Sequence, residues 1–149
     1  MKIYIVKETA NDEKRVALVP DVAKKFIKEG FEVFLEKDAG YLSKFFDEDY
    51  SSLGVNIDNN QECISDADVI FCVRVPDDNI INKIKSGACL IGLLNPYDNK
   101  EKLELLSRKG INAFSMELIP RSPRAQSMDV LSSQSNLAGY KAVINSASL

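Results

Sequence analysis

The feature that most constrains the fold of this chain is a regular alternation of short apolar runs with segments of helical spacing. The apolar runs cover residues 2–6, 31–36, 68–75, 88–94 and 111–116. Their nearly continuous apolar character is typical of strands that are covered on both faces. Because such strands alternate with helices, we predict an α/β fold: a Rossmann- or flavodoxin-like parallel sheet with helices on both faces.

Helices are expected between these runs. The first should begin at Pro20, since proline suits the first position of a helix, and end before Gly30. Further helices are expected near residues 47–53, 77–84 and 99–109.

A long helix is expected to complete the chain. Its pattern begins after Met128 and continues to Leu149 without a proline or a capping glycine. Ser127 can cap this helix, and Asp129 in its first turn favours the positive end of the helix dipole.

Composition excludes several classes of protein. A net charge of -3 argues against the basic face that nucleic-acid binding requires. No apolar stretch approaches the roughly eighteen residues of a membrane helix, so we expect no direct membrane insertion. The N-terminus turns charged from Lys7 and has no cleavage pattern of a signal peptide, which suits a cytoplasmic protein.

Cysteine and histidine usage limits the chemistry further. The three cysteines have no CxxC spacing, and Cys72 and Cys89 lie in apolar runs, so we expect reduced core residues there. The chain has no histidine, which excludes a Ser-His-Asp triad, a Cys-His pair and a histidine-ligated zinc. We predict no metal site.

The first strand-to-helix turn, VKETANDEKRVALVP (residues 6–20), contains no glycine, and GxGxxG occurs nowhere in the sequence. The pyrophosphate of a dinucleotide needs a close backbone approach that glycine permits and side chains block. We therefore expect that this chain does not hold a dinucleotide by the usual Rossmann route.

Two arginines are candidates for ligand binding. Arg15 lies in the loop after the first strand, at the carboxyl end of the sheet, where α/β folds place their sites. A solvated loop arginine is the simpler interpretation. Arg74 ends an apolar run, so its side chain is either at the exit of the strand or in a buried pair, and spacing leaves both open.

A third candidate is the polar segment RSPRAQSMDVLSSQSN (residues 121–136). Its residues Arg121 and Gln126 precede the start of the final helix, which carries Asp129 and Ser132. Such a mixture of donors and acceptors suits a nicotinamide carboxamide and ribose hydroxyls, although a well-capped helix start with solvated polar residues is also consistent with it. The residues predict a polar binding loop without naming its ligand.

Over essentially its whole length the sequence resembles the N-terminal part of the alpha subunit of proton-translocating NAD(P) transhydrogenase, in the superfamily shared with alanine dehydrogenase. The resemblance is carried by KIYIVKETANDEKRVALVP (residues 2–20), DADVIFCVRVP (66–76) and, most specifically, PRSPRAQSMDVLSSQSNLAGYKAV (120–143).

The resemblance implies that the polar segment closes over bound NAD(H) and faces the NADP(H)-binding component. By position, the loop's arginine, glutamine, aspartate and serine are Arg121, Gln126, Asp129 and Ser132, which would contact nicotinamide and ribose and align the rings for hydride transfer. The implied reaction transfers hydride from NADH to NADP⁺ held by a partner, coupled to proton translocation. The implied partners are membrane-embedded and NADP(H)-binding components, together with a second copy in a homodimer, at a peripheral cytoplasmic location.

In the family, a glycine-rich NAD-binding domain follows the segment that here ends at Leu149. We therefore divide the chain into an N-terminal α/β lobe, residues 1–127, and a linking helix, residues 128–149, that would lead into that domain. Because the glycine-rich domain is absent from this sequence, the isolated chain is expected to be inactive.

Two alternatives remain open. The first is a lobe of an alanine dehydrogenase-like enzyme, with Arg15 and Arg74 binding a carboxylate. Alanine dehydrogenases use a catalytic histidine near the position of Asn95, and deamination needs such an acid–base group, whereas hydride transfer between two nicotinamides needs only alignment. The second alternative is a non-catalytic assembly module that buries the apolar face of residues 130–144 in a partner.

Overall fold

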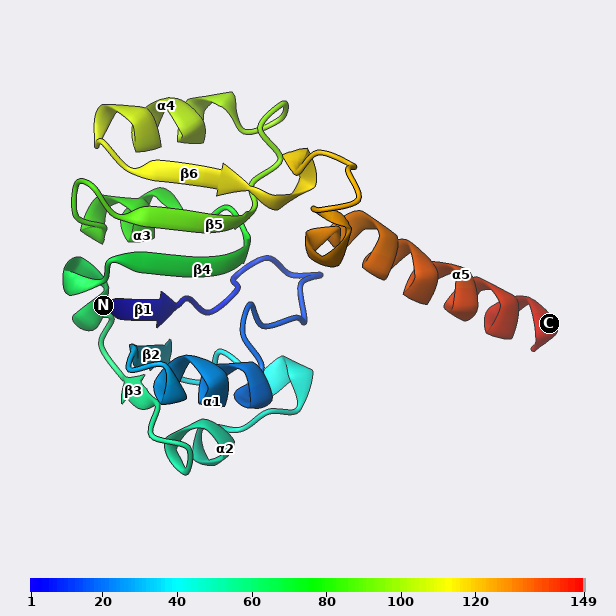
Figure 1. Cartoon of the computed structure of the whole chain (residues 1–149), viewed down its shortest axis with the longest axis horizontal. Helices are drawn as coiled ribbons and strands as arrows, with labels where there is room; N and C mark the ends of the chain where they lie inside the picture. The colour runs from blue at the N-terminus through cyan, green and yellow to red at the C-terminus, as the bar shows by residue number, and fades with distance from the viewer. Residues whose placement is uncertain (149) are drawn as a thin grey trace.

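The computed structural model describes residues 1–148, which form a parallel six-stranded sheet and its helices (Figure 1). The strands are β1 (Lys2–Ile5), β2 (Glu32–Glu36), β3 (Asn56–Asp58), β4 (Val69–Arg74), β5 (Cys89–Leu93) and β6 (Asn112–Ser115). Their order across the sheet is β3-β2-β1-β4-β5-β6, and each neighbouring pair is parallel. This is the Rossmann order, so the α/β prediction is confirmed and the flavodoxin order is excluded.

Five α-helices connect or follow the strands: α1 (Pro20–Lys28), α2 (Asp47–Ser51), α3 (Asp78–Lys83), α4 (Lys100–Arg108) and α5 (Val130–Ala147). Short 3₁₀ turns occur at η1 (Tyr41–Ser43), η2 (Cys63–Asp66), η3 (Met116–Leu118) and η4 (Gln126–Met128). As predicted, α1 starts at Pro20 and ends just before Gly30, whose φ of +85° breaks the helix.

Two apolar cores lie on opposite faces of the sheet, because successive strand side chains point to opposite sides. On one face, Ile3 and Ile5 of β1 pack with buried residues of β2, α1 and α2. On the other, Tyr4 packs with β4 and β5 and with α3 and α4. Cys72 belongs to this second core as expected, whereas Cys89 is only partly buried.

Helix α5 projects away from the sheet (Figure 1), and none of its described residues is buried. It starts one residue later than expected, and the prediction that Ser127 caps it is wrong. Asp129 is the N-cap, because Ser127 is part of the separate turn η4 while Asp129 has extended backbone angles. The predicted end at Leu149 lies outside the described residues.

Across residues 1–148, no helix combines the length and apolar character needed to cross a membrane.

Candidate ligand-binding site

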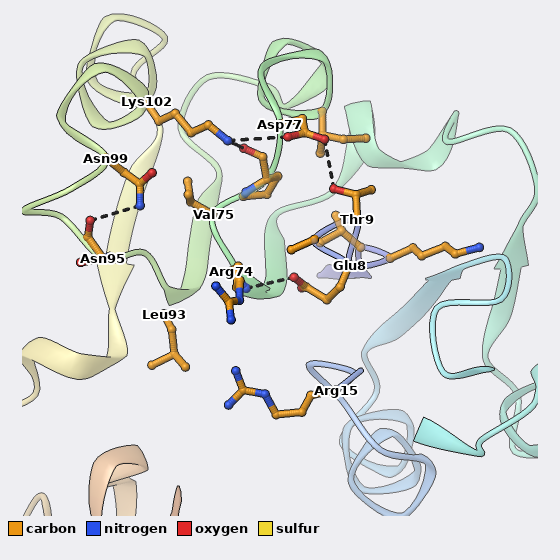
Figure 2. A pocket seen from close by; sticks show the side chains of 15 residues that line it. Glu8, Thr9, Arg15, Arg74, Val75, Asp77, Leu93, Asn95, Asn99 and Lys102 are labelled. Atoms are coloured by element: carbon orange, nitrogen blue, oxygen red, sulfur yellow. Dashed lines mark hydrogen bonds and ion pairs between the residues drawn. The ribbon is translucent and has the colours of Figure 1, made fainter. Parts of the chain in front are cut away.

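A pocket of about 570 Å³ opens where the carboxyl ends of β1, β4 and β5 meet (Figure 2). The carboxyl edge of a doubly wound sheet is where such folds bind their ligands. The charged and polar groups around this pocket include Glu8, Arg15, Arg74, Asp77, Asn95 and Lys102. The structure therefore brings together Arg15 and Arg74, the two arginines singled out from the sequence.

Glu13 links these two arginines. Its Oε1 accepts a hydrogen bond from Nε of Arg15 at 2.7 Å, and its Oε2 accepts from Nη2 of Arg15 at 2.6 Å and from Nε of Arg74 at 3.0 Å. The Glu13 side chain is only 3% exposed, while those of Arg15 and Arg74 are 41% and 55% exposed. The hydrogen bonds from Arg15 lower the pKa of Glu13 to about 2, so this carboxylate stays charged beneath the pocket.

The structure thus answers the question that spacing left open for Arg74. Its side chain is at the exit of β4, and its partner Glu13, rather than the arginine itself, is buried. Arg15 is not a freely solvated loop residue either, because three of its nitrogens donate to Glu13, counting its backbone N–H.

A second carboxylate, Glu8, fixes the end of β4. Its two oxygens accept the backbone N–H groups of Val73 at 2.6 Å and of Arg74 at 3.1 Å. These residues lie where the pairing of β4 with β5 changes register, so Glu8 satisfies donors at an irregular point of the sheet. Burial raises the pKa of Glu8 and outweighs the opposing effect of these hydrogen bonds.

The far side of the pocket is closed by polar groups from β4, the loop after it and α4. Thr9 donates to Asp77 at 3.0 Å, and Lys102 donates to the backbone oxygen of Pro76 at 2.9 Å and lies 3.7 Å from Asp77 (Figure 2). These contacts join the β1 loop to α4 across the sheet edge.

Asn95, where alanine dehydrogenases were expected to have histidine, does line the pocket. Its amide nitrogen donates to Asp98 at 2.7 Å, and its backbone adopts a φ of +45°. A carboxamide donates and accepts hydrogen bonds but does not exchange a proton as imidazole does. This position therefore offers binding without general acid–base catalysis.

The predicted nicotinamide loop lies outside this pocket, at the start of α5. Asp129 accepts from the backbone N–H of Leu131 at 2.9 Å and of Ser132 at 3.1 Å, and the Ser132 hydroxyl donates to it at 2.6 Å. These hydrogen bonds, with a smaller contribution from the charge of Arg121, lower the pKa of Asp129. Arg121 and Gln126 are exposed, and Gln126 lies in η4.

A hydrogen bond connects the two regions: Nη1 of Arg15 donates to Oε1 of Gln134 in α5 at 3.2 Å. Gln134 was not singled out from the sequence.

For the described part of the chain, no group of three or more Cys, Asp or Glu side chains is arranged to hold a metal ion. The polar groups of the pocket are instead paired with one another or with backbone groups.

A Rossmann-type lobe without a glycine-rich turn, and with paired arginines at the carboxyl edge of its sheet, defines a ligand-binding α/β lobe rather than a complete dinucleotide domain. The chain belongs to the family described as alanine dehydrogenase/PNT, N-terminal domain, whose family model matches residues 4–138.

Three relatives illustrate this membership. The chain is 43% identical to an NAD(P) transhydrogenase subunit alpha of Rickettsia prowazekii, and the match covers 99% of this chain and 40% of that protein. The crystal structure of transhydrogenase from Sinorhizobium meliloti matches with a TM-score of 0.94 and 42% identity, over 99% of this chain and 44% of that one. An L-alanine dehydrogenase structure matches with a TM-score of 0.77 and 27% identity, over 83% of this chain and 34% of that one.

The chain thus spans about two fifths of the length of the curated transhydrogenase subunit that it matches.

Proposed function

We propose that this chain forms part of the NAD(H)-side component of a proton-translocating NAD(P) transhydrogenase. The observation that carries the proposal is the exposed start of α5, where Asp129 and Ser132 are joined at 2.6 Å beside the solvent-facing Gln126 and Arg121. The identity of 43% with a transhydrogenase alpha subunit supports this choice over the more distant alanine dehydrogenases.

The donors and acceptors at the start of α5 fit the nicotinamide end of NAD(H). Arg121 and Gln126 provide N–H donors, and Asp129 and Ser132 provide acceptors and a hydroxyl. The glycine-free turn of residues 6–20 does not fit a pyrophosphate, so this chain would hold the nicotinamide end alone. When bound, the nicotinamide supplies the hydride chemistry.

The role of the four side chains is therefore orientation. Transfer of hydride from NADH to NADP⁺ held by a partner component depends on the distance and alignment of two rings and needs no proton-transferring residue. This requirement suits a chain without histidine. Coupling to proton translocation would involve the membrane-embedded components.

The proposal is tested by changing Gln126 and Asp129 in an assembled transhydrogenase that contains this chain. Gln126→Leu removes the amide, and Asp129→Asn removes the charge while retaining a side chain able to cap the helix. Each variant should slow hydride transfer more than it weakens NADH binding, because the lost contacts align the ring. Native rates of hydride transfer in both variants would refute the proposal.

A titration of the 149-residue chain with NADH, followed by nucleotide fluorescence, tests the division of the binding site. No saturable binding is expected, since the pyrophosphate contacts are missing. Saturable binding that is lost in Gln126→Leu and Asp129→Asn would show that the loop captures nicotinamide unaided.

A second candidate function is supported by the pocket itself. Arg15, Arg74 and Lys102 surround about 570 Å³, a space suited to a small carboxylate such as a keto acid, as in an alanine dehydrogenase-like enzyme. Pyruvate-dependent oxidation of NADH by the complete enzyme would favour this function. Its absence, together with transfer of hydride to NADP⁺, would favour the transhydrogenase.

A further inference from the structure

Helix α5 is joined to the lobe by very few polar contacts. Between α5 and the described residues before 121, the hydrogen bond from Arg15 to Gln134 is the only one. The two residues are 119 positions apart in the sequence, and no residue of α5 up to Ser148 is buried. The orientation of the helix therefore depends strongly on this contact.

Arg15 is itself held in place. Its Nε and Nη2 both donate to the carboxylate of Glu13, which forms a two-pronged pair with fixed geometry. Glu13 is buried and also accepts from Arg74 at the end of β4. Only Nη1 of Arg15 remains for another acceptor, and it is directed to Gln134 at 3.2 Å.

Gln134 lies in the first turns of α5, close to the residues proposed to face nicotinamide. It follows Ser132 by two positions and the N-cap Asp129 by five, or about 7.5 Å along the helix axis. A constraint on Gln134 is therefore also a constraint on where Asp129 and Ser132 stand relative to the sheet.

We propose that Arg15 and Gln134 are positioning residues for the nicotinamide loop. The series Arg74–Glu13–Arg15–Gln134 transmits the rigid carboxyl edge of the sheet to the start of α5 and fixes the direction in which Asp129 and Ser132 are presented. The inference rests on the proposed function for its consequence in catalysis, but its structural component concerns the 149-residue chain alone.

The structural component is tested by amide hydrogen exchange, measured by NMR on the full 149-residue chain. Gln134→Leu removes the acceptor, and Arg15→Lys keeps the charge but cannot bind Glu13 and Gln134 together. A hydrogen bond of this kind predicts about three- to tenfold faster exchange in residues 133–137 for each variant. The double variant should show no further increase, because both changes remove the same contact.

Ser135→Leu is the matched control. It makes a polar-to-apolar change on the adjacent residue, whose side chain forms none of the hydrogen bonds between α5 and the lobe. Exchange in this control should stay at the native rate or slow slightly. If Gln134→Leu behaves like Ser135→Leu, or if the double variant is additive, the positioning role is wrong.

The catalytic component is tested in an assembled transhydrogenase by measuring hydride transfer at saturating NADH. Gln134→Leu should lower kcat about three- to tenfold while KM for NADH changes little, since the helix start is misaligned but its contacts remain. Asp129→Asn in the same assay separates the two ideas. If Asp129→Asn slows transfer and Gln134→Leu does not, the positioning inference fails; if neither slows it, the proposed function itself fails.

Discussion

At the scale of single residues, Glu13 determines the electrostatics of the pocket. Two guanidinium groups at the carboxyl edge of a sheet would repel each other, and the buried carboxylate between them removes this repulsion. The same carboxylate occupies most donors of Arg15, so a ligand that enters the pocket competes with Glu13 or with Gln134 for this arginine.

The first prediction concerns the pH dependence of this pair. Because the pKa of Glu13 falls from 4.5 to about 2 on folding, its stabilising contribution is complete above pH 4.5 and is lost as the pH falls from 4.5 toward 2. Glu13→Gln should therefore lower the free energy of unfolding at pH 7 by about 1–3 kcal/mol, the half-exposed arginines reducing the upper value. Urea unfolding followed by circular dichroism measures this difference.

The difference between Glu13→Gln and the native chain should shrink as the pH approaches 2, because Glu13 then becomes protonated in both folded and unfolded chains. Glu104→Gln, on the exposed side of α4, is the control and should track the native chain at every pH. A difference that persists undiminished at pH 2 would assign the effect of Glu13→Gln to packing rather than charge.

The residues of the site were only partly predictable. Arg15 and Arg74 were found because arginine near the carboxyl end of an apolar strand is unusual. Glu8 and Glu13 were missed because each is one carboxylate in a charged loop, and their burial depends on β4, more than sixty residues away. Gln134 was missed for the same reason, at a separation of 119 residues.

At the scale of elements, the apolar runs located five strands to within one or two residues, since each is buried on both faces. Strand β3 was not predicted, because three residues, Asn56–Asp58, are too few to show a period. The N-cap of α5 was assigned to Ser127 instead of Asp129, since both residue types cap helices and only the backbone angles distinguish them.

The second prediction compares two glycines in regular elements. In β5, a Cβ on Gly92 would lie 2.5 Å from both the backbone oxygen and the sulfur of Cys72, whereas a Cβ on Gly139 of α5 meets nothing within 4 Å. Gly92→Ala should therefore destabilise the chain by about 1–3 kcal/mol, through overpacking between β4 and β5. Gly139→Ala should instead stabilise α5 by about 0.5–1 kcal/mol.

Two measurements separate these effects. Gly92→Ala should lower the midpoint of urea unfolding, and Gly139→Ala should increase the helical circular dichroism signal while the midpoint changes little. An unchanged midpoint for Gly92→Ala would mean that β4 and β5 separate easily to admit a methyl group.

At the scale of the whole molecule, the lobe is well packed but α5 is not covered. Large apolar side chains of this helix are exposed, among them Leu137 at 63% and Tyr140 at 70%. At 100° per residue, Leu137, Tyr140 and Ile144 share one side of the helix, and Leu131 and Ala138 lie on the opposite side. A helix that is apolar on two sides is typical of one covered on both sides.

The last prediction follows from this exposure. The 149-residue chain should self-associate, because an uncovered apolar helix favours contact with another copy. Analytical ultracentrifugation should give a mass above 16.6 kDa that rises with concentration and does not fall with added salt, since the contact is apolar. The double variant Tyr140→Gln, Ile144→Gln should weaken association about tenfold or more, whereas Lys141→Gln, between them, should leave it unchanged. A mass of 16.6 kDa at every concentration would show that exposure of α5 alone does not drive self-association.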